Sequence, residues 1–194
     1  MSQSHATTIA AGNELEKMVW ERVPHKIDNL TEFVESQQSV RERNKVFVAN
    51  KKQVKACELF DSELEPDLIA FKHLTCYIIE VKDGDTLDTK KAQGEQDTMT
   101  RFSHEVANNA PYMFKTIMCC FNADSREQIH TGLKRRFALD QCMTGAELCQ
   151  LIGIDYDEIV RIRRNDCQSN LDYFVRGLID IPNIRNMIRT RLKK

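Results

Sequence analysis

The sequence has no long uncharged apolar run, and this absence argues against a membrane protein. Within 194 residues, no such stretch approaches the roughly 20 apolar residues that a membrane span requires. The opening MSQSHATTIAAGNELEK also lacks the basic start and apolar centre of a secretion signal. We therefore expect a cytoplasmic protein that makes no contact with a membrane.

Several cofactor motifs are missing as well. The seven cysteines are odd in number and show no C-x-x-C spacing, which argues against a disulfide framework and a zinc site. The five histidines do not fall at metal-ligand spacing with a cysteine or with each other. No glycine-rich phosphate loop is present, so we expect neither ATP-driven function nor a nucleotide cofactor. Most cysteines lie in apolar or helical patterns and should be small buried hydrophobes.

Charge is nearly balanced overall but is unevenly distributed. The formal net charge of -1 argues against indiscriminate binding to nucleic acid. Residues 161–194, however, carry nine Lys or Arg against three Asp, and residues 41–55 carry six positive side chains against one negative. These segments are either solvated basic faces or surfaces for an anionic partner.

The order of the predicted elements indicates an α/β fold with a central mixed β-sheet flanked by helices. We expect a core over residues 1–139 and a helical C-terminal region over 140–194. The expected strands are 45–50, 67–71, 75–81 and 112–121, and the expected helices are 13–23, 25–40, 90–110, 125–139 and most of the chain from residue 140.

Two apolar strands carry charged residues at one end. If the strands turn at His73 and Leu74, Asp67 lies opposite Glu80. Side chains alternate along a strand, so Glu80 and Lys82 point to the same face, and Asp67 joins them there. Both faces of this hairpin are otherwise apolar, which places it at the centre of the sheet with its charged end at a cleft.

Two facing carboxylates repel each other unless a cation lies between them. Mg²⁺ is well suited, because it binds one or two carboxylates together with water and phosphate oxygens. Lys82 beside such an ion could position water and stabilise negative charge on a phosphate. The alternative is structural, with Lys82 simply bridging Asp67 and Glu80 in a cluster of ion pairs.

The pattern Pro66-Asp67, twelve residues, then Glu80-Val81-Lys82 resembles the PD-(D/E)XK motif of Type II restriction endonucleases and related nucleases. The resemblance implies Mg²⁺-dependent cleavage of DNA to leave 5′-phosphates. It also implies that Asp67, Glu80 and the Val81 carbonyl bind the metal, and that Lys82 is the catalytic lysine.

Two further residues follow from the same resemblance. Many members of the family carry a glutamate on the first helix, for which Glu14 is the candidate catalytic residue. Some place a glutamine near the scissile phosphate, and Gln93 matches it as a DNA-binding residue. Both side chains could instead be ordinary solvated helix residues.

The segment TGAELCQLIGIDYDEIVRIRRND has the spacing of a helix-turn-helix. Gly153 would form the turn and Asp155 would cap the second helix, which carries Arg161, Arg163 and Arg164. Such a helix could bind DNA in the major groove. A helical hairpin used for packing or dimerisation would show the same apolar pattern.

The leading hypothesis is a sequence-specific endonuclease of the Type II restriction class that cuts double-stranded DNA. One active site makes one cut, so a symmetric double-strand cut is most simply made by a homodimer. Two alternatives remain open: a structure-specific or DNA-repair nuclease with the same chemistry, and a non-catalytic DNA-binding regulator.

Overall fold

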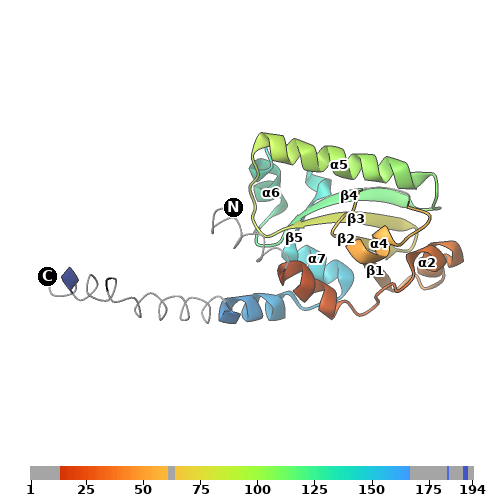
Figure 1. Cartoon of the computed structure of the whole chain (residues 1–194), viewed down its shortest axis with the longest axis horizontal. Helices are drawn as coiled ribbons and strands as arrows, with labels where there is room; N and C mark the ends of the chain where they lie inside the picture. Colours follow the sequence, from red (N-terminus) through yellow and green to blue (C-terminus); the bar gives the residue numbers. More distant parts are fainter. Residues whose placement is uncertain (1–13, 61–63, 167–182, 184–189, 192–194) are drawn as a thin grey trace. The chain divides into compact units, whose positions relative to one another are not determined.

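The computed structural model describes residues 14–60, 64–166, 183 and 190–191. The chain divides into two compact units, Met1–Ile154 and Asp155–Lys194. In the described part, every strand belongs to the first unit, where the strands form one mixed sheet with helices around it (Figure 1). The predicted α/β fold is thereby confirmed.

The sheet has five strands in the order β1-β2-β3-β4-β5. Strands β1 to β3 are antiparallel, whereas β4 and β5 run parallel to β3. The predicted hairpin register is confirmed, since Phe71 pairs with Cys76 and Leu68 with Ile79. The strands are β1 (Val46–Asn50), β2 (Leu68–Lys72), β3 (Thr75–Lys82), β4 (Met113–Cys120) and β5 (Cys142–Thr144).

Helices cover both faces of the sheet (Figure 1). Helix α5 (Thr89–Ala107) lies along one face, where its Phe102 and Met99 join Ile78 of β3 in a hydrophobic cluster. On the opposite face lies α7 (Gly145–Ile152), which contacts β1, β4 and β5. The central hairpin is therefore buried from both sides, as its apolar pattern predicts.

The other helices are short. Residues 14–22 form the first one that the structure describes. It is followed by α2 (Leu30–Ser36), α3 (Gln38–Arg41), α4 (Lys51–Lys55), α6 (Arg126–Gly132) and the 3₁₀ helix η1 (Leu139–Gln141). In the second unit, residues 156–166 are helical.

The predicted helix over 25–40 is correct only in part. Helix α2 begins at Leu30, because the side chain of Asn29 accepts a hydrogen bond from the Glu32 N–H and caps it. Just before it, Ile27 donates a main-chain hydrogen bond of 2.8 Å to Val48 and so extends the edge of the sheet at β1. Pairing with a strand thus overrides the helical spacing of the apolar residues.

The prediction of a helix over 125–139 is wrong after Gly132. A Cβ at Gly132 would lie 2.1 Å from the main-chain oxygen of Asp85, so the helix packs tightly against that loop. Lys134 and Arg135 then adopt positive φ angles of 56° and 60°, which end the helix.

The prediction that most of the chain from residue 140 is helical is also wrong at its start. Cys142–Thr144 form β5 and pair with β4. Three residues are too few to show a strand periodicity, and Thr144 also caps α7. Both β5 and α7 belong to the first compact unit.

The six cysteines of the described residues, including Cys57 and Cys76, are buried and form no disulfide with one another. Cys167 lies outside the described residues. None of the helices within the described residues combines the length and the apolar character of a membrane span.

Candidate active site

One end of the sheet gathers the charged residues. Strands β1 and β3 end there and β2 begins there, as the pairing of Asn50 with Leu68 and of Leu68 with Ile79 shows. Lys51, at the start of α4, therefore lies beside Asp67 at the start of β2. Glu80 and Lys82 lie at the end of β3 on the side of the sheet that α5 covers.

Asp67 is the most buried of these charged groups, with 4% of the residue exposed. One carboxylate oxygen, Oδ2, accepts a hydrogen bond of 2.7 Å from the main-chain N–H of Val81. The other, Oδ1, forms an ion pair with the ammonium group of Lys51. Both oxygens therefore have partners, which offsets the cost of burying this carboxylate.

Lys51 links Asp67 to the first described helix. Its Nζ also lies 3.4 Å from Oε2 of Glu16. Burial alone would lower the pKa of Lys51, but the hydrogen bond and charge of Asp67, together with Glu16, raise it. The pKa of Glu16 is raised by its own burial and by the charge of Asp67. The ammonium of Lys51 thus occupies a cation position between two carboxylates.

Lys82 also lies between two carboxylates. Its Nζ donates hydrogen bonds to Oε1 of Glu80, at 2.6 Å, and to Oε1 of Glu95 on α5, at 3.0 Å. Burial opposes its charge, but both glutamates outweigh this effect and raise the pKa of Lys82. The side chain is therefore held as a charged ammonium group.

Glu80 is the most perturbed carboxylate of the cluster. Burial of the side chain and the charge of Asp67 raise its pKa to about 7, against the favourable contribution of Lys82. A carboxylate in this situation gains more from an added positive charge than an exposed one would.

Counted in their ionised forms, the four carboxylates exceed the two ammonium groups by two formal negative charges. The carboxylates are Glu16, Asp67, Glu80 and Glu95, and the ammonium groups are Lys51 and Lys82. This excess matches the charge of one divalent ion. Among the described residues, no group of three or more His, Cys, Asp or Glu side chains is arranged to hold a metal by itself.

A divalent ion at this site would therefore need other oxygen ligands besides Asp67 and Glu80. The Val81 carbonyl, water and substrate phosphate are the oxygen ligands that Mg²⁺ accepts in addition to one or two carboxylates. The donor set fits this ion, and it offers no sulfur or imidazole ligand that would favour zinc.

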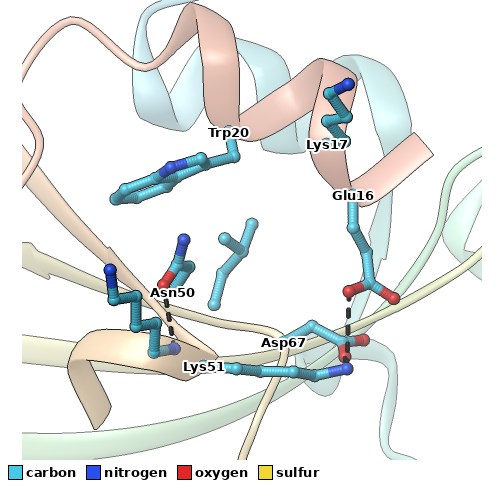
Figure 2. Close-up of a pocket in the computed structure, with 8 residues that line it drawn as sticks. Glu16, Lys17, Trp20, Asn50, Lys51 and Asp67 are labelled. Atoms are coloured by element: carbon cyan, nitrogen blue, oxygen red, sulfur yellow. Dashed lines mark hydrogen bonds and ion pairs between the residues drawn. The ribbon is translucent and has the colours of Figure 1, made fainter. Parts of the chain in front are cut away.

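An open pocket of about 340 Å³ adjoins the cluster (Figure 2). Glu16, Lys51 and Asp67 form one side of it, and Trp20 and Asn50 form another. Lys17, Lys52 and Leu68 complete its lining.

The structure brings together Asp67, Glu80 and Lys82, as the predicted hairpin register requires. It places the two other candidates differently. Glu14 is exposed, and Glu16, two residues later on the same helix, is the glutamate that reaches the cluster. Gln93 donates a hydrogen bond of 2.7 Å to Asp97 on its own helix.

Three members of the cluster do not follow from the sequence pattern: Glu16, Lys51 and Glu95. Glu16 flanks the buried Leu15 as Glu14 does, so helical spacing alone does not choose between the two. Lys51 and Glu95 belong to segments whose position depends on long-range packing. The sequence indicates only that Lys51 begins a helix, α4, and that Glu95 lies in the first half of another, α5.

The C-terminal prediction agrees locally with the structure. Gly153 has a φ of 76° and ends α7, as expected of a turn glycine. Oδ1 of Asp155 accepts hydrogen bonds from the N–H groups of Asp157 and Glu158, so it caps the following helix. Arg161 and Arg164 are exposed on that helix, whereas Arg163 is partly buried.

Comparison with known proteins decides the family. The chain is 34% identical over 196 aligned residues to the Type II restriction enzyme HhaII of Haemophilus parahaemolyticus, and the alignment covers 97% of this chain and 86% of that enzyme. This chain belongs to the Type II restriction enzyme family. No family model matches the sequence, and no solved structure matches it either. In this restriction enzyme family member, the charged end of the sheet is the candidate catalytic centre.

Proposed function

We propose that this chain is a Mg²⁺-dependent, sequence-specific endonuclease that cuts double-stranded DNA and leaves 5′-phosphates. The single observation that carries the proposal is the cluster of Asp67, Glu80 and Lys82 at one end of the sheet. Membership of the Type II restriction enzyme family supports DNA cleavage at a specific sequence. The order of these residues supports a PD-(D/E)XK assignment within that family.

Asp67, Glu80 and the carbonyl of Val81 would hold the metal. Bound there, Mg²⁺ would supply a reactive water and would neutralise charge on the phosphate. The excess negative charge of the cluster supports this assignment, because an added cation relieves the repulsion between Asp67 and Glu80.

Lys82 would stabilise the negative charge that develops on the phosphate during cleavage. Its hydrogen bonds to Glu80 and Glu95 fix the position of the ammonium group before substrate binds. Such preorganisation avoids a cost of reorienting the group during the reaction. We propose Glu95 and Glu16 as positioning residues that hold Lys82 and Lys51, and Glu14 and Gln93 as lesser candidates for the catalytic and DNA-binding roles.

Arg161, Arg163 and Arg164 would contact DNA from the second unit, through phosphates or guanine edges. A symmetric double-strand cut is most simply made by two active sites. We therefore propose a homodimer, in which two-fold symmetry places one site on each strand.

Plasmid digestion with Mg²⁺, followed by sequencing of the ends, tests the proposal. Discrete fragments with a common terminal sequence and 5′-phosphates are expected. Cutting of branched but not of intact duplex DNA would instead favour a structure-specific or repair nuclease. Retention of DNA without any cutting would favour a non-catalytic DNA-binding regulator.

A further inference from the structure

We propose that the pocket beside the catalytic cluster binds the nucleotide of the cleaved strand that adjoins the scissile phosphate. The proposed contacts are Trp20, Asn50 and Lys52. This inference rests on the proposed nuclease function and adds the path of the DNA strand to it.

The pocket adjoins the catalytic cluster at Asp67, whereas Glu80 and Lys82 are not part of its lining. Glu16, Lys51 and Asp67 line the pocket and also belong to the charged cluster. Successive nucleotides of one strand are spaced by about 3.4 Å along a DNA helix. A strand with its scissile phosphate at Asp67 therefore brings a neighbouring nucleotide to this pocket. The pocket volume of about 340 Å³ is sufficient for part of a nucleotide.

The lining offers both a flat apolar surface and hydrogen-bond donors. The indole of Trp20 lies over Asn50 on one side of the pocket (Figure 2), and an indole ring can stack on the face of a base. Oδ1 of Asn50 accepts the Lys52 N–H at 2.9 Å as the helix cap, which leaves its amide NH₂ group as a donor. In the described residues, this NH₂ group has no hydrogen-bond partner.

Lys52 supplies a charge suited to a phosphate. It is exposed, and no carboxylate pairs with it in the part of the chain that the structure describes. Lys55, one turn later on α4, is instead paired with Glu65 at 3.1 Å and does not line the pocket. Substitution of either lysine by alanine removes one positive charge from the same short helix. The two variants therefore form a matched pair for a test.

A structural role for Trp20 is the competing explanation. The ammonium of Lys26 lies 5.5 Å from the centroid of its ring, which is a cation–π contact. A purely structural Trp20 would affect folding, but its removal would not change nucleotide binding.

Trp20 is the single tryptophan of the chain, so its fluorescence reports on this pocket alone. Thymidine 3′,5′-bisphosphate is titrated into the full-length protein in Ca²⁺ under selective tryptophan excitation. We expect saturable quenching in the wild type, and affinity lowered at least about five-fold in Lys52→Ala. Lys55→Ala should bind as the wild type does. Absence of quenching, or equal effects of the two lysine variants, would overturn the pocket assignment.

Asn50→Asp gives a second arm that preserves the fold. Aspartate keeps the oxygen that caps α4 but replaces the amide donor with a repelling charge, so nucleotide affinity should fall at an unchanged melting temperature. In plasmid digests, Trp20→Ala should raise KM roughly ten-fold through lost stacking. If the wild type cuts no DNA, the proposed nuclease function is wrong. If the wild type cuts DNA and both Trp20→Ala and Asn50→Asp keep its KM and nucleotide affinity, only the pocket proposal is wrong.

Discussion

The carboxylate of Asp67 accepts a hydrogen bond of 2.7 Å from the main-chain N–H of Val81, across the two central strands. This bond occupies one oxygen and turns the other toward the ammonium group of Lys51. It fixes Asp67 beside the segment Glu80-Val81-Lys82, so the proposed metal ligands are positioned by the sheet itself. The geometry therefore depends on the most buried part of the fold rather than on a mobile loop.

Substitution of Lys82 tests whether its positive charge accelerates cleavage. Lys82→Ala should lower the rate of the chemical step by about 10²–10³-fold, because one preorganised donor to the phosphate is lost. DNA affinity should change little, since the interaction strengthens only as charge develops. Single-turnover cleavage and a separate binding titration in Ca²⁺ measure the two quantities. An equal loss of affinity would make Lys82 a phosphate anchor instead.

Substitution of Lys51 tests whether its ammonium group replaces a metal ion beside Asp67 when no metal is bound. Lys51→Met should lower the melting temperature in EDTA, because Asp67 is left buried without its partner. The same change should tighten binding of Ca²⁺, since a competing positive charge is removed. Melting curves with and without Ca²⁺, together with calorimetry, measure both effects. Lys55→Met is the control, and weaker Ca²⁺ binding by Lys51→Met would contradict the prediction.

The raised pKa of Glu80 predicts that the stability of the metal-free protein depends on pH. Its folded pKa of about 7 lies above the ordinary value of 4.5, so the folded state binds the proton more tightly than the unfolded state. Ionisation of Glu80 in its buried site lowers the free energy of unfolding. This loss of stability is absent below the unfolded pKa, grows as pH rises, and is complete above the folded pKa. Glu80→Gln should therefore be more stable than the wild type by roughly 2 kcal/mol at about pH 8, with little difference at about pH 5.

Denaturant titrations in EDTA at the two pH values measure this difference. Lower stability of Glu80→Gln at the higher pH would mean that the ion pair with Lys82 outweighs the burial of charge.

Substitutions of the three arginines in the second unit test the proposal that their helix binds DNA. Single changes of Arg161, Arg163 and Arg164 to Ala should produce one of two behaviours. Loss of a phosphate contact weakens binding to every duplex and reduces the salt slope by about one unit. Loss of a base contact costs roughly 1–3 kcal/mol at one base pair and relaxes specificity there.

Affinity at two salt concentrations, with the melting temperature of each variant, distinguishes these behaviours from a packing role. Unchanged affinity in all three variants, with lower thermal stability or loss of the proposed dimer, would remove the helix-turn-helix hypothesis.

The central hairpin could be predicted from sequence because its information is local. A short turn at His73 and Leu74 fixes which residues face each other, and Asp67 and Glu80 follow from that register. Lys51 and Glu16 could not be predicted in this way, since they reach Asp67 through the packing of distant segments. Strand β5 was missed for a different reason: three residues carry too little pattern, and pairing with β4 decides their conformation.

The central claim is that Asp67 and Glu80 form the catalytic metal site, and plasmid digestion in Mg²⁺ by Asp67→Asn and Glu80→Gln beside the wild type tests it most directly. Asparagine can still accept the Val81 N–H and glutamine keeps the shape of glutamate, so both variants should remain folded. We predict discrete fragments from the wild type, none from either variant, and none from the wild type in EDTA. Cutting at the wild-type rate by Asp67→Asn or by Glu80→Gln would contradict the assignment.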